Sequence, residues 1–430
     1  MSEERTPGFN TLAIHAGAKP DPATGARATP IYQTTSYVFD DVEHAAALFG
    51  LKAFGNIYTR IMNPTQAVLE ERVAALEGGT AALAVASGHA AQALAFHTIC
   101  QPGDEIIAAK KLYGGSINQL GYSFKSFGWN VVWADTDDLS TFEAAVSPRT
   151  KAIFIESIAN PGGIVTDIAA ISESAKKAGV PLIVDNTLAT PYLCRPFEHG
   201  ADIVVHSLTK FMGGHGNSIG GVIVDGGTFN WSAEAGRYPL LSEPRPEYHG
   251  VKLHETFGNF AFAIACRVLG LRDLGAAISP FNAFLFITGT ETLPLRMQRH
   301  SDNALAVAQW LSKQSEVTWV SYAGLPGDRY HNLAKRYCPK GAGAVLTFGL
   351  RGGFDAGVRV VESVQLHSHL ANIGDTRSLI IHPSSTTHSQ LSDEARVESG
   401  AGPDVVRLSV GLEDVEDIIA DLDQALKAAA

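Results

Sequence analysis

The stretch DIVVHSLTKFMGGHGNSIGGVIVD, residues 202–225, contains two apolar segments of strand length with a lysine between them. The first segment is followed by Ser207, Thr209 and Lys210, and a glycine-rich run then leads to the second segment at 220–225. Continuous apolar segments of this length predict strands that are buried on both faces of a sheet. Lys210 then directly follows a buried strand, where it can anchor phosphate, serve as a reactive amine or remain a solvated loop charge.

Segments of the same kind recur earlier in the chain, with helical segments between several of them. Asn63 followed by Pro64 predicts a helix start, because asparagine caps helices and proline lacks only an N–H that is unpaired there anyway. Gly78 and Gly79 end that helix, and residues 168–179 also have helical character. The alternation of strands and helices predicts a mostly parallel sheet. The further strand segments are ALAVA (82–86), EIIAA (105–109), NVVWA (130–134), KAIFIE (151–156) and PLIVD (181–185).

The last third of the chain has a different order of predicted elements, which indicates a second, smaller α/β domain. We expect an N-terminal arm at 1–59 that contacts a neighbouring subunit, a large domain at 60–285 and a small domain at 286–430. The predicted elements of the small domain are a helix at 302–314, a strand at 344–350, a helix at 356–370, strands at 378–382 and 405–411, and a helix at 415–429.

Composition and charge favour a cytoplasmic enzyme. The 430 residues are 45% hydrophobic and 18% charged, and the formal charge of −11 argues against non-specific binding to nucleic acid or to an anionic membrane surface. The four cysteines lie far apart, which fits a reducing compartment and neither a disulfide framework nor a zinc site. The N-terminus lacks a signal-peptide pattern, and polar residues interrupt the most apolar long window, 81–100.

Polar residues follow several predicted strands at their carboxyl ends, where ligands bind in open parallel sheets. Taken singly, each has an ordinary explanation. A glycine turn such as Ser87-Gly88-His89 is common at helix starts, although its free N–H groups also suit a phosphate. Asp185 fits a helix cap, a metal ligand or the partner of a heterocyclic nitrogen. The other residues of this set are Tyr113, Glu156, Asn160, Thr187, Ser207, Thr209 and Lys210.

The combination of these groups is more specific than its parts. A lysine amine, hydroxyls with a helix N-terminus for phosphate, and an acid for a ring nitrogen together describe a pyridoxal 5'-phosphate (PLP) site. Lys210 would form the Schiff base, Asp185 would keep the pyridine nitrogen protonated, and Tyr113 would stack on the ring. No P-loop pattern GxxxxGK[ST] is present, and no GxGxxG follows the first strand, which argues against a nucleotide site.

The stretch DNTLATPYLCRPFEHGADIVVHSLTKFMGGHG, residues 185–216, resembles the cofactor-lysine region of the Cys/Met-metabolism family of PLP enzymes. The resemblance extends from TLAIHAG (11–17) to VVRLSVGLED (405–414), which is nearly the whole chain. It implies the aspartate-aminotransferase-like fold (fold type I), PLP as cofactor, and homodimers, usually paired into homotetramers, whose subunits share active sites.

The resemblance also implies which positions contact the cofactor. Lys210 matches the Schiff-base lysine, Asp185 the partner of the ring nitrogen, and Tyr113 the stacking tyrosine, which is expected to assist proton transfer. His89 departs mildly from relatives that have methionine or glutamine there, since the contact is mainly through the backbone. The other implied cofactor contacts are Gly88, His89, Ser207 and Thr209 at the phosphate, Asn160 near the phenolic oxygen, and Thr187.

Further implied contacts involve the substrate and a second subunit. Tyr58 and Arg60, in IYTRIMNPT, match a pair that reaches the phosphate of the neighbouring subunit. Arg407 matches the arginine that pairs with the substrate α-carboxylate, for which a guanidinium fork is suited. Asn160, Ser378 and Tyr58 are also expected to contact the substrate.

Three segments, at 238–258, 271–300 and 372–388, resemble the O-acetylhomoserine sulfhydrylase branch of the family. Gly115 stands where methioninase-type γ-lyases have a cysteine after Tyr-Gly. We therefore expect a γ-replacement in which O-acetyl-L-homoserine and sulfide give L-homocysteine and acetate, in the biosynthesis of methionine. The alternative is methionine γ-lyase or cystathionine γ-synthase/lyase activity at the same site.

Two hypotheses from other classes are weaker. A catalytically silent binding protein on the same scaffold would not need the intact lysine, aspartate, tyrosine and arginine of the predicted site. A zinc hydrolase is suggested by His367 with His369 and by His382 with His388. Their spacings match no standard zinc motif, and residues i and i+2 of a helix do not share a face, so no metal is expected.

Overall fold

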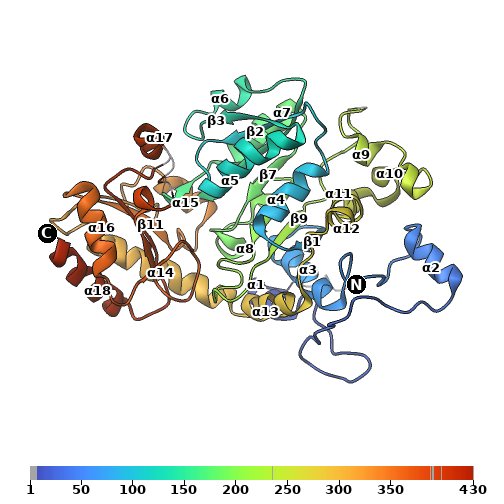
Figure 1. The fold of residues 1–430 in the computed structure, drawn as a ribbon, viewed down its shortest axis with the longest axis horizontal. Helices are drawn as coiled ribbons and strands as arrows, with labels where there is room; N and C mark the ends of the chain where they lie inside the picture. Colours follow the sequence, from blue (N-terminus) through green and yellow to red (C-terminus); the bar gives the residue numbers. More distant parts are fainter. Residues whose placement is uncertain (1–6, 235, 388, 390–391, 399, 430) are drawn as a thin grey trace.

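The chain folds into two α/β units with an N-terminal arm in the computed structural model (Figure 1). The structure describes residues 7–429 apart from 235, 388, 390–391 and 399. The arm contains α1 (Phe9–His15) and α2 (Val42–Phe49), and α2 extends away from the body of the molecule. Large apolar side chains of the arm are left exposed, with Val38 97% and Phe54 84% accessible.

A seven-stranded sheet forms the larger unit, in the order β1-β9-β8-β7-β4-β2-β3. Its pairings are parallel except those of β9, which runs antiparallel to β1 and β8. Every strand predicted for this sheet is confirmed to within one residue at each end, as is its mostly parallel character. The strands are β1 (Ala81–Val85), β2 (Glu105–Ala109), β3 (Asn130–Ala134), β4 (Thr150–Glu156), β7 (Leu182–Asp185), β8 (Ile203–Ser207) and β9 (Gly221–Asp225).

Capping side chains set the starts of the helices that matter for the site. Asn63 Oδ1 accepts the N–H of Thr65 at 2.9 Å at the start of α3 (Pro64–Glu77), which confirms the predicted helix start. Ser87 Oγ accepts the N–H of Ala90 at 3.1 Å at the start of α4 (Gly88–His97), which packs on β8 and β9. Because α4 directly follows β1, its N-terminus lies at the edge of the sheet where the parallel strands end.

The sheet of this unit is surrounded by two longer helices, α7 and α13, by several short helices and by a small hairpin. They are α5 (Gly114–Asn118), α6 (Ser140–Ala144), α7 (Ile168–Ala178), α8 (Thr190–Leu193), α9 (Pro239–Ser242), α10 (Leu253–Phe257), α11 (Ala261–Ala265), α12 (Arg272–Leu274), α13 (Pro280–Glu291), β5 (Ile158–Ala159) and β6 (Ile164–Val165).

A five-stranded sheet, in the order β10-β11-β14-β13-β12, forms the C-terminal unit. The predicted strands and the last helix of this unit are confirmed, with strand ends that differ by up to two residues, whereas the first helix begins nine residues earlier than predicted. The boundaries of the three predicted domains stay predictions. The elements are α14 (Leu293–Leu311), β10 (Val317–Ser321), α15 (His331–Tyr337), β11 (Val345–Leu350), α16 (Gly353–Ser363), β12 (Ser368–His369), β13 (Leu379–Ile381), α17 (Asp393–Glu398), β14 (Val405–Ser409) and α18 (Val415–Ala429).

The predicted helix at 356–370 is wrong in its second half, because α16 ends at Ser363. Asp421 of α18 accepts the backbone N–H groups of Gln365, Leu366 and His367 at 2.7, 2.9 and 3.0 Å. These bonds hold the chain outside a helix, and the next two residues join the sheet as β12. His367 therefore does not lie on a helix, although the helix predicted at 356–370 would have included it.

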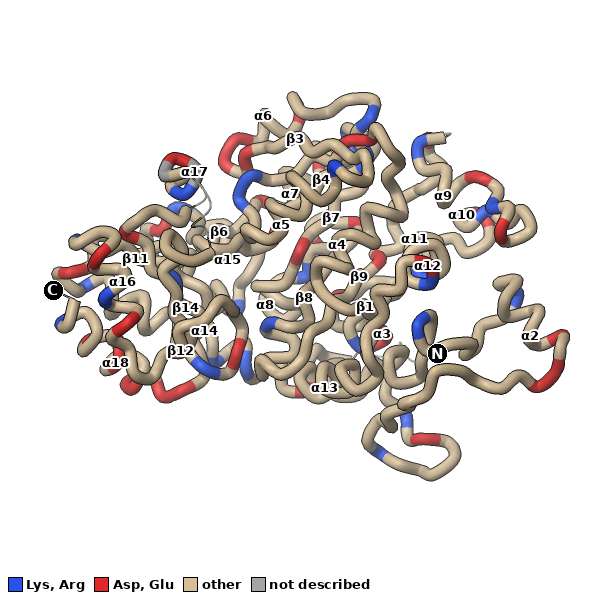
Figure 2. Tube along the Cα trace, viewed as in Figure 1, with Lys and Arg blue, Asp and Glu red and all other residues tan. Residues whose placement is uncertain are grey.

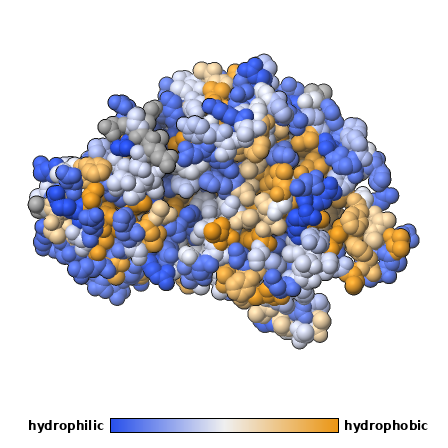
Figure 3. All heavy atoms as spheres, viewed as in Figure 1, coloured by the Kyte–Doolittle hydropathy of each residue, from blue (hydrophilic) through white to orange (hydrophobic). Residues whose placement is uncertain are grey.

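Lys and Arg positions are interspersed among Asp and Glu positions along the chain trace (Figure 2). Apolar side chains are exposed at the end of the molecule that carries α2 (Figure 3). Within the described residues, no helix is both long and apolar enough to cross a membrane.

Candidate active site

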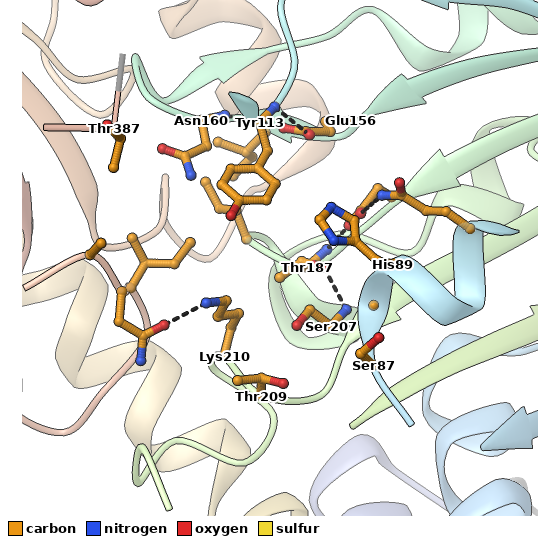
Figure 4. A pocket seen from close by; sticks show the side chains of 18 of the residues that line it. Ser87, His89, Tyr113, Glu156, Asn160, Thr187, Ser207, Thr209, Lys210 and Thr387 are labelled. Atoms are coloured by element: carbon orange, nitrogen blue, oxygen red, sulfur yellow. Dashed lines mark hydrogen bonds between the residues drawn. The ribbon is translucent and has the colours of Figure 1, made fainter. Parts of the chain in front are cut away.

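A cavity of about 260 Å³ opens at the carboxyl ends of β7 and β8, beside the N-terminus of α4 (Figure 4). Residues from both α/β units line it. The predicted site residues that do so are Gly88, His89, Tyr113, Asn160, Asp185, Thr187, Ser207, Thr209, Lys210 and Arg407, and further lining residues include Ser87, Gln92, Glu156, Ile219, Asn372 and Thr387.

Lys210 follows β8 and is held away from solvent. Its Nζ donates a hydrogen bond to Asn372 Oδ1 at 2.5 Å, across the two units. Burial, with a smaller contribution from the positive charge of Arg407, lowers the pKa of Lys210 to about 8. The side chain is therefore not a solvated loop charge, and a sizeable fraction of it is a neutral, nucleophilic amine close to neutral pH.

Arg407 lies on β14, is 6% exposed and lines the same cavity. Its Nη1 donates to Asn160 Oδ1 at 3.1 Å, and its Nη2 donates to the backbone carbonyl of Asn372 at 3.1 Å. Its Nε has no hydrogen-bond partner among the described residues. A buried donor without a partner is costly, so this guanidinium can still take up a carboxylate.

Asp185 ends β7 and is fixed by two donors. Its Oδ1 accepts the N–H of Thr187 at 2.9 Å, and its Oδ2 accepts from Gln92 Nε2 at 3.1 Å. Gln92 also donates to Ser116 Oγ at 3.1 Å. The sequence analysis missed Gln92, although it lies four residues after Gly88 on α4 and so on the same helix face.

The N-terminus of α4 and the end of β8 approach each other closely enough to form a cradle for an anion. A Cβ on Gly88 would lie 2.8 Å from the Cβ of Ser207, so only glycine permits this approach. Thr187 Oγ1 accepts the N–H of Ser207 at 2.8 Å, and Thr209 Oγ1 accepts the N–H of Gly220 at 3.1 Å. Free N–H groups, hydroxyls and the helix dipole suit a phosphate here.

Tyr113 and His89 present their rings to the cavity. The ring centroids are 6.0 Å apart with an interplanar angle of 23°. Glu156 accepts the N–H of Tyr113 at Oε1 (2.7 Å) and the N–H of Asn160 at Oε2 (3.2 Å). Burial, and then the negative charge of Asp185, raises the pKa of Glu156 well above its ordinary value. Glu156 thus holds two predicted site residues, a role that the sequence analysis did not assign.

Three predicted site residues do not line this cavity. Tyr58 and Arg60 lie together at a separate surface pocket, where the Arg60 guanidinium is 5.3 Å from the Tyr58 ring centroid and Nη1 donates to the carbonyl of Arg272 at 2.9 Å. Ser378 is fully buried, and its hydroxyl donates to Glu413 Oε2 at 2.9 Å. The described contacts of Ser378 are all within the protein.

Two of the four histidines that suggested zinc, His367 and His382, have partners within the fold. His367 Nδ1 lies 2.7 Å from Asp421 Oδ2, and His382 contacts Ser385 Oγ and the carbonyl of Pro403. His388 lies outside the described residues. Within the described part of the chain, no group of three or more His, Cys, Asp or Glu side chains is arranged to hold a metal.

The cavity fits PLP. It combines an amine with a lowered pKa, a strand-end carboxylate, an anion cradle that a Cβ would fill, an aromatic ring, and a guanidinium with an unpaired donor. The first four groups suit the aldehyde, the ring nitrogen, the phosphate and the ring face of PLP, and the guanidinium of Arg407 leaves a second anion site.

Comparisons with known proteins agree with this chemistry. The profile of the family described as "Cys/Met metabolism PLP-dependent enzyme" matches residues 10–427. An O-acetyl-L-homoserine sulfhydrylase of Leptospira meyeri is 53% identical over 97% of this chain and 96% of its own. O-acetyl-L-homoserine sulfhydrylase 1 of Thermus thermophilus is 54% identical over 97% and 99%. A crystal structure from Campylobacter jejuni, named for O-acetylhomoserine (thiol)-lyase and containing N'-pyridoxyl-lysine-5'-monophosphate, superposes with a TM-score of 0.95 at 41% identity, covering 98% of this chain and all of that one.

Proposed function

Because the chain belongs to the Cys/Met-metabolism family of PLP-dependent enzymes, we propose that it is an O-acetylhomoserine sulfhydrylase. It converts O-acetyl-L-homoserine and sulfide into L-homocysteine and acetate, a step in the biosynthesis of methionine. Relatives that share 44–54% of their residues over nearly the full chain are named for this activity or for homocysteine synthesis, which supports the proposal. The structural observation that best supports this function is that Lys210 and Arg407, from different units, face one cavity.

The residues that would hold PLP come from several strand ends along one edge of the sheet. Ser87, Gly88 and His89 at the start of α4, with Ser207 and Thr209 after β8, would bind the phosphate. Tyr113, Asn160, Asp185 and Thr187 would contact the ring, and Lys210 would hold the cofactor covalently. When bound, the cofactor supplies an electron-withdrawing ring that stabilises negative charge at the substrate Cα.

Asp185 would face the ring nitrogen as a carboxylate. Gln92 and the Thr187 N–H each donate to one of its oxygens, which fixes the orientation of the carboxylate.

Lys210 is the proposed base for the Cα proton. A pKa near 8 is close to the operating pH, so the amine both accepts and returns a proton readily. The hydrogen bond to Asn372 keeps Nζ at the wall shared with Arg407. Tyr113 is proposed to assist proton transfer from the opposite wall.

Arg407 is proposed to bind the substrate α-carboxylate. Asn160 and the Asn372 carbonyl hold two of its nitrogens, and the unpaired Nε remains for the incoming oxygen. A fixed carboxylate fixes the direction of the Cα–H bond relative to Lys210. This orientation of the reacting groups is the main way in which positioning contributes to catalysis.

The net reaction exchanges one bond at Cγ. The Cγ–O bond of the ester breaks and acetate leaves with the electron pair, while hydrosulfide forms the Cγ–S bond of homocysteine. No oxidation or reduction occurs. Ile219 and Ile373 contribute apolar side chains to the lining of the cavity.

Product analysis of the PLP-loaded protein tests the proposal. With O-acetyl-L-homoserine and sulfide we expect homocysteine and acetate in equal amounts. The same assay with cysteine as acceptor, with no acceptor, and with the O-succinyl ester separates this activity from its relatives. Predominant 2-oxobutyrate and ammonia would identify a γ-lyase, and predominant cystathionine a cystathionine γ-synthase; either result contradicts the proposal.

We also propose that the protein acts in the cytoplasm as a homodimer or homotetramer whose copies share active sites. The exposed apolar side chains of the arm, including Val38, Val42 and Phe54, support a second copy as its partner. Tyr58 and Arg60 lie outside the cavity of their own chain, which is compatible with a role at the phosphate of a neighbouring copy.

A further inference from the structure

The segment after Lys210 is held by a buried cation on α14. Arg296 is 5% exposed, and its guanidinium donates to the carbonyls of Phe211 (Nη1, 2.6 Å) and Met212 (Nη2, 3.1 Å). Nη2 also donates to the carbonyl of Gly289 at 2.7 Å, and Nε donates to Thr292 Oγ1 at 3.1 Å. Among the described residues no carboxylate pairs with it, so this cation is balanced only by backbone and hydroxyl dipoles.

The absence of a paired carboxylate is informative because a buried charge is costly. Burial alone lowers the pKa of Arg296 to about 10, so the side chain still carries its charge at neutral pH. An apolar residue of the same length would fill the space without that cost. What it could not do is bind two successive carbonyls that point away from the strand.

Glycines bring the segment and the guanidinium into close contact. Gly214 has φ +74°, and a Cβ there would lie 2.1 Å from Arg296 Nη1. A Cβ on Gly289, in α13, would lie 2.6 Å from the carbonyl oxygen of Gly213. Gly213 and Gly214 thus lie between α13 and the guanidinium, where there is room for backbone only.

The same face of α14 contacts the residues that directly follow β14, the strand that carries Arg407. His300, four residues after Arg296, lies 2.7 Å from the Val410 carbonyl through Nδ1, and its ring meets that of Phe211 edge to face at 5.3 Å. Asn303 donates to the Gly411 carbonyl at 3.0 Å. Positions spaced by four and three share one face of a helix, so α14 fixes the lysine segment and the end of β14 together.

We infer that Arg296 is a positioning residue for proton transfer: by holding the carbonyls of Phe211 and Met212 it fixes the backbone from which Lys210 reaches the substrate Cα. This inference rests on the proposed role of Lys210 as the base. It predicts that loss of Arg296 affects the proton-transfer step more than substrate affinity, because Arg407 remains in place.

The experiment compares Arg296→Met and Arg296→Lys with a matched control, Arg72→Met. Arg72 is also fully buried, donates to the backbone carbonyls of Ile14, Ala16 and Ile287, and lies outside the cavity; unlike Arg296 it also has a carboxylate partner, Glu291 at 3.4 Å. Both methionine variants lose a buried cation that binds carbonyls, so a purely structural effect appears in both.

Two readouts separate positioning from stability, both measured on folded, PLP-loaded protein. For Arg296→Met we expect kcat to fall by about 10- to 100-fold with KM changed less than about threefold, and the isotope effect on kcat with Cα-deuterated substrate to rise. The kcat and the isotope effect of Arg296→Lys should lie between those of Arg296→Met and wild type, because an ammonium supplies donors in a poorer geometry. Arg72→Met should keep the wild-type kcat per folded site and the wild-type isotope effect.

The second readout does not depend on turnover. Amide hydrogen exchange at Gly213 and Gly214, whose N–H groups bond to the carbonyls of Leu208 and Lys210 at 2.9 and 2.7 Å, should become faster in the Arg296 variants with and without PLP. It should stay at the wild-type rate in Arg72→Met.

Wild-type kcat and isotope effect in folded Arg296→Met would overturn the inference. If Arg296→Met does not fold, Arg296→Lys provides the test. Wild-type kcat, isotope effect and amide exchange in Arg296→Lys would then overturn the inference. Failure of the proposed function looks different, because wild-type protein would then make no homocysteine.

Discussion

Lys210 and Arg407, from different α/β units, are joined by one residue, since Nζ of Lys210 bonds to the side chain of Asn372 and Nη2 of Arg407 to its backbone carbonyl. Asn372 therefore contacts both the proposed base and the proposed carboxylate anchor. A shift of the C-terminal unit relative to the large sheet would move Asn372 and Arg407 together relative to Lys210. Catalytic geometry in this protein thus depends on how the two units pack.

Lys210→Ala is expected to abolish measurable turnover while the protein still folds. The lysine serves chemistry and makes no contribution to the apolar core, and a positioned base is commonly worth 10²–10⁴-fold on its own. Turnover of O-acetyl-L-homoserine and a thermal unfolding curve check the two halves of this prediction. A folded variant with wild-type γ-replacement would show that another group is the base.

Asp185→Asn is expected to keep the bound-cofactor absorbance and to lose turnover by roughly two or more orders of magnitude. The substitution removes the charge that supports a protonated ring nitrogen but keeps the shape, and Lys210 and the phosphate cradle remain. Exchange of the substrate Cα proton, followed by NMR in heavy water, measures the affected step. Normal exchange with normal cofactor binding would mean that Asp185 is not the partner of the ring nitrogen.

Arg60→Ala and Lys210→Ala are expected to complement each other when mixed. If copies share sites, a hybrid dimer has one site in which both residues are intact, and some activity returns to two inactive preparations. Subunit exchange is verified separately with differently tagged chains. Demonstrated exchange without any recovery would argue that Arg60 serves the site of its own chain or none.

Cofactor binding should depend on pH through Lys210. Its pKa is lowered from the usual lysine value to about 8, mainly by burial, so in cofactor-free protein the amine is mostly neutral above pH 8. Since only the neutral amine attacks an aldehyde, the rate of PLP incorporation should rise with pH and level off above about 8, rather than rise up to about 10.4 as for a free lysine. Stopped-flow absorbance after removal and re-addition of PLP gives the profile. An apparent pKa near 10 would contradict the burial of this amine.

The sequence allowed the large sheet and most residues that line the cavity to be predicted, because both depend on local patterns. Continuous apolar segments identify buried strands, and polar cavity residues such as Asp185 and Lys210 lie at or just after the ends of these strands. Gln92 and Asn372 were missed because their importance depends on partners far away in the chain. The helix at 356–370 was overextended for a similar reason, since the carboxylate of Asp421 that ends it lies more than fifty residues later.

Gly88 shows that a position can be intolerant of change without offering any side chain to a ligand. The start of α4 touches the Cα and Cβ of Ser207, which are backbone-anchored atoms that no rotamer change can move aside. In a saturation mutagenesis experiment, all nineteen substitutions at Gly88 should therefore be depleted, alanine included. At the neighbouring His89 a wider range of residues should survive, because the phosphate contact expected there is mainly through the backbone.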